Sequence, residues 1–184
     1  MRALYLVPLL AGLALVFYPL LVYLGLGYWG VKPLALLLIV LACLRLAANR
    51  WLGIPSGNTV LVMIVIALVA GVTLVTGSVA GLKVYPVAMN ALMLGVFAFS
   101  LWQPPSMIER FARLREPDLP LQAIPYTRNV TIVWCVFFTV NGAIAAATLF
   151  ASDQVWAIYN GFVAYVLMGL LFAGEYLVRQ LIRQ

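Results

Sequence analysis

The sequence contains no histidine and only two cysteines. Without histidine, a serine or cysteine nucleophile has no imidazole base, and zinc and iron lose their commonest nitrogen ligand. Cys43 and Cys135 both lie within apolar stretches and form no CxxC motif, so we interpret them as small interior residues. These absences exclude histidine-based acyl transfer and most transition-metal chemistry, and we expect no metal and no cofactor.

Charged residues are also scarce. They make up 9% of the 184 residues, whereas 66% are hydrophobic, and the mean hydropathy is +1.10. About a quarter of the residues of a soluble domain are charged, so this chain could not cover a water-facing surface of its size. The net charge of +6 does not indicate nucleic-acid binding, because the basic residues are scattered between apolar runs. We therefore predict an all-α, polytopic membrane helix bundle that forms one transmembrane domain within the lipid bilayer.

The apolar residues fall into six hydrophobic segments. We interpret the first as an uncleaved helix, because it is too long for a signal peptide and lacks a convincing cleavage site. Pro19 interrupts this segment, and the second segment is short for a full crossing, so we expect five or six crossings. The predicted segments are about 3–27, 33–48, 59–80, 84–102, 129–151 and 154–178.

The positive charges divide unevenly between the two sides of this bundle. With six crossings and the N-terminus inside, nine arginines face one side, and only Lys32 and Lys83 face the other. Because basic loops resist translocation, we predict a bacterial inner-membrane protein with both termini in the cytoplasm. The predicted cytoplasmic set is Arg2, Arg45, Arg50, Arg110, Arg113, Arg115, Arg128, Arg179 and Arg183.

Residues 103–128 form an extended polar region, in which 105–116 is predicted to be a short cytoplasmic amphipathic helix between prolines. Ser106 and Glu109 have the spacing of a capping box, and Glu109 and Arg113 have the spacing of an i,i+4 ion pair. Such a helix lies on the leaflet with its arginines, Arg110 among them, toward anionic headgroups. Two interpretations stay open: an interfacial connector, or an element for partner docking or headgroup recognition. Its apolar side would consist of Met107, Ile108, Phe111 and Leu114.

Three asparagines, Asn90, Asn141 and Asn160, lie within the last three apolar segments. An amide in hydrocarbon needs a hydrogen-bond partner, and an interhelical hydrogen bond contributes about 0.6–2 kcal/mol. Together with Tyr159, these amides either hold helices together or line a polar cavity that receives a lipid headgroup or polar tail. Glycine follows asparagine at 141–142 and at 160–161, which predicts that the last two segments pack closely on each other.

Glu175 lies at the edge of an apolar segment, and Arg179 follows it one helical turn later. This spacing predicts an i,i+4 ion pair at the cytoplasmic interface, with a catalytic acid as the alternative. Arg128 and Trp134 lie at the entrance of the fifth segment, where basic and aromatic residues anchor helices at the headgroup level. The predicted interfacial or partner-docking set is therefore Glu109, Arg110, Arg113, Arg128, Trp134, Glu175 and Arg179.

Several short motifs follow one another in the C-terminal half. A tryptophan ends the fourth segment, a P-x-x-x-x-R loop follows, and the fifth segment opens with asparagine and W-x-V-F-F. The residues are Trp102, Pro105, Arg110, Asn129, Trp134, Val136, Phe137 and Phe138. Over about 95–180, this order resembles the septation protein A family, the inner-membrane-spanning intracellular septation proteins.

Three further motifs, YTRxVT at 126–131, WCxFF at 134–138 and YNG at 159–161, narrow this resemblance. They are most similar to a relative encoded in gene clusters for aryl polyene pigments and fatty-acid-like synthesis. The resemblance implies a multi-spanning, non-enzymatic protein that supports the cell envelope and division through contacts with envelope-synthesis proteins.

Three functional hypotheses follow from these observations. The first is a non-catalytic inner-membrane scaffold or assembly partner in cell-envelope or lipid biogenesis. The second is a binder or translocator of a lipid or lipid-linked intermediate, such as an aryl polyene lipid, that uses the asparagines and could act as a homodimer. The third is a membrane-embedded transferase that uses Glu175 or Glu109 with an arginine, although no second positioned acid or base is visible.

Overall fold

The computed structural model describes residues 23–25, 30–51, 57–114 and 116–182. The first predicted segment, 3–27, and the predicted cytoplasmic Arg2, Arg115 and Arg183 lie almost wholly outside these ranges. Within them the chain is helical and forms no strand, which confirms the all-α prediction for this part of the protein. Its elements are α3 (Val31–Trp51), α4 (Gly57–Thr76), α5 (Val79–Lys83), α6 (Tyr85–Trp102), α7 (Met107–Arg113), α8 (Ala123–Thr148), α9 (Asp153–Ile158), the π-helical η1 (Tyr159–Val163) and α10 (Ala164–Ile182).

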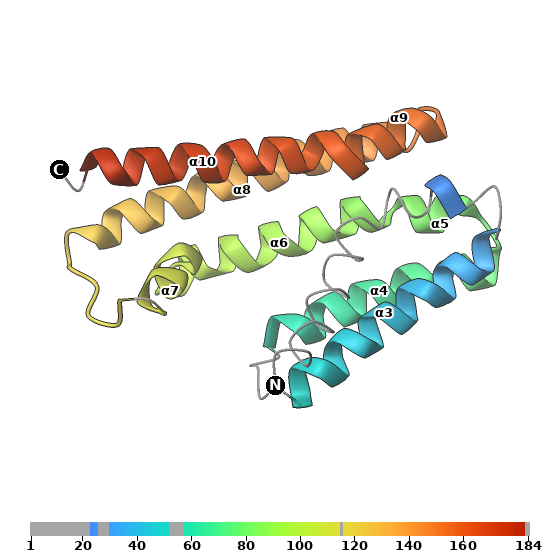
Figure 1. Cartoon of the computed structure of the whole chain (residues 1–184), viewed down its shortest axis with the longest axis horizontal. Coiled ribbons are helices and arrows are strands. Elements are labelled where there is room, and N and C mark those ends of the chain that lie inside the picture. Colours follow the sequence, from blue (N-terminus) through green and yellow to red (C-terminus); the bar gives the residue numbers. More distant parts are fainter. Residues whose placement is uncertain (1–22, 26–29, 52–56, 115, 183–184) are drawn as a thin grey trace.

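The long helices run alternately in opposite directions along one axis (Figure 1). Helices α3 and α4 form a hairpin, and α6 contacts both α4 and α8. Side chains of α10 contact α8, as in the pairs Tyr126–Glu175 and Trp134–Phe172. This order brings Lys32, Lys83 and Asp153 to one end of the bundle, which we name the lysine end. The opposite end, which we name the arginine end, carries Arg50, Arg110, Arg113, Arg128 and Arg179.

Three helical stretches are long and apolar enough to cross a membrane, namely Val79–Trp102, Ala123–Thr148 and Asp153–Gln180, and Leu61–Thr76 is a shorter apolar helix. Their outer faces carry large apolar side chains, such as Leu68, Val136 and Leu170, which are 65%, 57% and 64% exposed. Hydrocarbon is a favourable solvent for such faces, whereas water is not. The structure therefore supports a membrane protein, with three long apolar helices and one shorter one among the described residues.

The predicted third segment, 59–80, is wrong at its C-terminal boundary. Helix α4 ends at Thr76, because Gly77 adopts a positive φ of 63° that glycine tolerates and most residues avoid. The side chain of Ser78 then accepts a hydrogen bond from the backbone N–H of Ala80 and starts α5. Residues 79–83 therefore open the next apolar stretch instead of closing the previous one.

Helices α4 and α5 approach each other closely at Gly81. A methyl group on Gly81 would overlap Oγ1 of Thr73 and would lie 3.1 Å from the Cα of Thr73. Helix α8 approaches α6 in the same way, since a methyl group on Gly142 would lie 3.1 Å from the Cβ of Asn90. The Asn141–Gly142 sequence thus packs on α6. The predicted contact between the last two segments is present as well, where Tyr159 and Asn160 of η1 bind residues of α8.

Two apolar clusters form the interior of the described bundle. The first joins the α3–α4 hairpin to α5 and α9, and its largest fully buried side chain is Trp156. It includes Leu34, Leu38, Ile66, Leu82 and Trp156. The second cluster lies nearer the arginine end and consists of Phe97, Met107, Trp134 and Phe138.

Candidate functional site

Three of the predicted cavity residues form one chain of hydrogen bonds across three elements. The hydroxyl of Tyr159, on η1, donates to Oδ1 of Asn141, on α8, at 2.9 Å. Nδ2 of Asn141 donates to Oδ1 of Asn90, on α6, at 3.0 Å, and Nδ2 of Asn90 donates to the carbonyl of Pro86 at 2.9 Å. Each amide therefore has a protein partner, as a group buried among helices requires.

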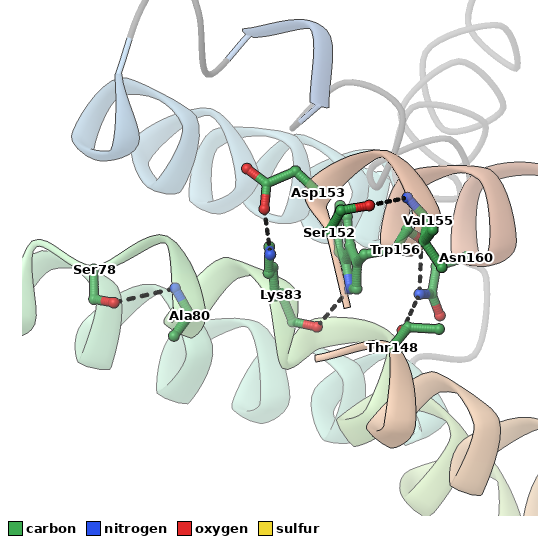
Figure 2. A network of polar contacts seen from close by, with 9 residues as sticks. All are labelled: Ser78, Ala80, Lys83, Thr148, Ser152, Asp153, Val155, Trp156 and Asn160. Atoms are coloured by element: carbon green, nitrogen blue, oxygen red, sulfur yellow. Dashed lines mark hydrogen bonds and ion pairs between the residues drawn. The ribbon is translucent and has the colours of Figure 1, made fainter. Parts of the chain in front are cut away.

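The fourth predicted residue, Asn160, lies in a separate group of contacts (Figure 2). Its Nδ2 donates to Oγ1 of Thr148 at 3.0 Å and to the carbonyl of Trp156 at 2.9 Å, and the residue is 3% exposed. Asn141 and Thr148 are seven residues apart on α8, which corresponds to about 10 Å along the helix. The three asparagines thus do not converge on one point, although adjacent residues of η1 bind α8 at both places.

A groove among the described residues lies away from these amides. It is formed between α3 and α4, with a volume of about 160 Å³, and its lining includes Ile39, Ala42, Met63 and Leu74. Its walls are almost entirely apolar. The groove therefore offers acyl-like material a surface, but it offers no polar group to a headgroup.

The lysine end carries a polar network that the sequence did not predict (Figure 2). Nζ of Lys83 and Oδ1 of Asp153 form an ion pair at 2.5 Å, and the indole N–H of Trp156 donates to the carbonyl of Lys83 at 3.1 Å. The side chain of Ser152 accepts from the backbone N–H of Val155 and caps α9. These contacts fasten the start of the last apolar stretch to the junction of α5 and α6.

At the arginine end, the predicted i,i+4 ion pair between Glu109 and Arg113 is confirmed. Oε1 of Glu109 accepts from Nε and Nη2 of Arg113 at 2.9 and 2.8 Å, and Glu109 is only 6% exposed. The predicted capping box is wrong, because Oγ of Ser106 is buried without a partner among the described residues. Glu109 turns toward Arg113 and so leaves Ser106 without the reciprocal contact that a capping box requires.

Two side chains from neighbouring helices cap α7 instead. Oγ of Ser100, on α6, accepts from the backbone N–H of Met107 at 2.8 Å. Oγ1 of Thr131, on α8, accepts from the backbone N–H of Ile108 at 3.3 Å. Both acceptors satisfy N–H groups that a helix start leaves open, so they hold α7 against the bundle. The residues predicted to form the apolar side of this helix therefore differ in burial. Met107 is buried, whereas Phe111 and Leu114 are exposed.

The pair Glu175 and Arg179 also has the predicted geometry, with Nε of Arg179 donating to Oε1 of Glu175 at 2.9 Å. The hydroxyl of Tyr126 lies 3.3 Å from the carbonyl oxygen of Glu175 and joins the start of α8 to α10. Trp134, in contrast, is not an interfacial anchor, because it is 3% exposed among aromatic rings. Its ring centroid lies 4.6 Å from that of Phe172. A helix that starts at Ala123, six residues before the predicted segment, places Trp134 in its middle.

Two residues of the predicted docking set, Arg110 and Arg128, are exposed and have no carboxylate partner among the described residues. Nε and Nη2 of Arg110 donate to the carbonyls of Pro105 and Gln103 at 2.8 and 3.2 Å. Of the arginines in the predicted docking set, Arg113 and Arg179 are thus paired with a glutamate, and Arg110 and Arg128 are exposed without one.

Comparison with models of protein families, with curated proteins and with solved structures found no match.

Proposed function

We propose that the protein is a non-catalytic, multi-pass component of the bacterial inner membrane that serves cell-envelope or lipid biogenesis by assembling with other membrane proteins. The observation that carries this proposal is the pairing of carboxylates with cations at both ends of the bundle. Glu109 and Glu175 are bound by arginines, and Asp153 is bound by Lys83. General acid–base catalysis needs a side chain within hydrogen-bond reach of a substrate, whereas these carboxylate oxygens are already bound by a neighbouring cation of the protein.

The resemblance of residues 95–180 to the septation protein A family supports the same proposal, as does the broad apolar surface of the bundle. Side chains such as Leu68 on α4 and Leu170 on α10 are exposed along different helices. Helices associate in lipid through such faces by van der Waals packing, because hydrocarbon does not itself drive them together. An assembly partner therefore has more than one face available to it.

The alternative proposal, a binder or translocator of a lipid-linked intermediate, requires amides that are available to a ligand. Asn90 and Asn141 bind each other, and Asn160 binds Thr148 in a different place. This pairing favours a role in joining helices. The transferase alternative has less support still, because Glu109 and Glu175 each form an ion pair with an arginine of the same helix.

Photo-crosslinking in the producing cell tests the proposed assembly. A benzoylphenylalanine replaces Leu68 or Leu170 in the full chain, with the gene at its natural locus, and adducts are identified by mass spectrometry. We expect at least one position to capture a protein of envelope or lipid synthesis. The same group at Leu38, which is fully buried, is the matched control and should capture nothing. Adducts with lipid alone at every exposed position would contradict the proposal, and an adduct of two copies would indicate a homodimer.

The proposed orientation is tested separately by thiol labelling. Single cysteines replace Asp118, at the arginine end, and Gln154, at the lysine end, and both native residues are exposed. Cys43 and Cys135 are changed to alanine in both variants. With cytoplasmic termini, an impermeant maleimide added to intact spheroplasts should label position 154 and spare position 118 until the membrane is opened. The reverse pattern would invert the proposed topology.

A further inference from the structure

Helix α7 contacts α6 and α8, and the exposed residues of these three neighbouring elements have mixed chemistry. We name this set the α7 surface. It consists of Trp102, Arg110, Phe111, Leu114 and Arg128. Trp102 and Leu114 are 80% and 82% exposed, and Phe111 is 50% exposed. Large apolar side chains beside exposed arginines suit neither water nor hydrocarbon alone. They suit the boundary between the two, where one part of the surface is wet and the other is apolar.

The α7 surface has a fixed place relative to the apolar helices. Ser100 and Thr131 bind the first N–H groups of α7 and tie it to α6 and α8. The side chain of Met107 is buried with Phe97 and Trp134, and this packing also holds α7 against the bundle. Helix α7 thus lies where α6 ends and α8 begins, which is the depth of the lipid headgroups if these helices cross the bilayer.

The charge of this surface comes from arginines that lack a carboxylate partner. Arg113 is neutralised by Glu109, so it contributes little net charge to the outside. Arg110 binds two backbone carbonyls, which are neutral acceptors and leave its positive charge uncompensated. Arg128 is exposed, and none of the described carboxylates pairs with it. The exposed acidic residues of this region, Glu116 and Asp118, follow α7 in the turn that leads to α8.

We propose that the α7 surface binds anionic phospholipid, with Arg110 and Arg128 contacting lipid phosphates and with Trp102, Phe111 and Leu114 inserted among the neighbouring lipids. Arginine suits this role because its planar guanidinium matches the oxygens of a phosphate group. Tryptophan is favoured at headgroup depth, and the leucine and phenylalanine side chains gain from burial at the acyl boundary. This inference needs only insertion in a membrane and does not depend on the proposed assembly partners.

Lipid selectivity of the purified full chain tests this inference. The protein is reconstituted in phosphatidylcholine vesicles that contain a trace of spin-labelled phosphatidylglycerol or spin-labelled phosphatidylcholine. Electron paramagnetic resonance then gives the fraction of each label that is immobilised by the protein. We expect a preference for phosphatidylglycerol, and we expect Arg128→Gln to lower it about fivefold, because one arginine near an anionic surface contributes about that factor. Arg110→Gln should act in the same direction.

Two control variants separate a local site from a general effect of charge. Lys32→Gln removes one exposed positive charge at the lysine end, and Arg50→Gln removes one at the arginine end but on α3. Both should keep most of the preference for phosphatidylglycerol. Arg128→Gln is the decisive variant, because the side chain of Arg128 makes no hydrogen bond or ion pair with the described residues, whereas Arg110 also supports the turn before α7. Arg128→Lys should keep part of the preference, since it keeps the charge and loses the planar guanidinium.

Three results would overturn the inference. The first is an equal affinity of the unchanged protein for the two spin labels. The second is a loss in Lys32→Gln or Arg50→Gln as large as that in Arg128→Gln. The third comes from a photo-crosslinker in place of Leu114, where an adduct with protein and none with lipid would assign the α7 surface to a protein partner.

Discussion

Lys83 and Asp153, at the lysine end, form an ion pair between residues that are 70 positions apart in the chain. The ion pairs of the arginine end, Glu109 with Arg113 and Glu175 with Arg179, each join residues four positions apart on one helix. A pair within one helical turn can form in an isolated helix, so it adds little to the contact between helices. A pair between α5 and α9 exists only when the bundle is assembled. The ion pair of the lysine end therefore joins two helices, whereas each ion pair of the arginine end lies within one helix.

Among the variants that test this difference between the two ends, replacement of Trp156 by alanine should lower stability the most. Trp156 is 1% exposed, joins α9 to the α3–α4 hairpin and α5, and donates a hydrogen bond to the carbonyl of Lys83. We expect Trp156→Ala to lower the free energy of unfolding by about 3–5 kcal/mol, because it empties a large packed volume. Titration with dodecyl sulfate of the protein in mild detergent, followed by circular dichroism, measures this change.

Trp156→Phe is the matched control for that experiment. It keeps an aromatic ring in the apolar cluster and removes the indole N–H that binds Lys83. We expect a loss of about 1–2 kcal/mol, most of it from the carbonyl that loses its donor. A Trp156→Ala variant within about 1 kcal/mol of the unchanged protein would show that the lysine end does not hold the helices together.

Local features of the fold could be predicted from the sequence, because their causes lie within a few residues. Apolar runs predicted the long helices, and four-residue spacing predicted both arginine pairs correctly. The helix break at Gly77 was missed because only three uncharged, weakly polar residues, 76–78, interrupt the apolar run there. Its cause is a positive φ and the capping side chain of Ser78, which an apolar run conceals.

Replacement of Gly81 by alanine should have the next largest effect. The new methyl group would meet Oγ1 and the backbone of Thr73, and backbone cannot move aside as a flexible side chain can. We expect Gly81→Ala to lower the free energy of unfolding by about 1–3 kcal/mol through overpacking. The same titration in mild detergent measures it.

Gly95→Ala is the control for this prediction, because a methyl group on Gly95 would meet nothing within 4 Å. It should leave stability unchanged or raise it slightly, since alanine favours the helix over glycine. Thr73→Ala combined with Gly81→Ala should recover part of the loss, because it removes the hydroxyl that clashes. Equal effects of Gly81→Ala and Gly95→Ala would contradict the close approach of α4 and α5.

The contacts between distant helices could not be predicted, because many residues of the same kind compete for each partner. The sequence indicated that Asn90, Asn141 and Asn160 need hydrogen bonds, but nothing in their spacing showed that Asn90 would bind Asn141 while Asn160 binds Thr148. Trp134 was placed at the interface because tryptophan favours it, whereas the aromatic ring of Phe172 and its neighbours bury it. Such choices depend on how whole helices pack, and that packing is decided by many weak contacts together.

Removal of one ion pair at each end should have the smallest effects, and these two variants compare an ion pair between helices with an ion pair within one helix. Asp153→Asn leaves the ammonium of Lys83, which is 11% exposed, without its carboxylate, and we expect a loss of stability of about 1 kcal/mol. Glu175→Gln weakens a pair within one turn of α10, so its loss should be about 0.3–0.5 kcal/mol. The same titration, carried out at low and at moderate salt, measures both losses of stability. The loss in Asp153→Asn should shrink less as the salt concentration rises, because salt screens the nearly buried ammonium of Lys83 less well. A larger loss in Glu175→Gln than in Asp153→Asn would mean that the arginine end stabilises the bundle through its charges, against the division between the two ends.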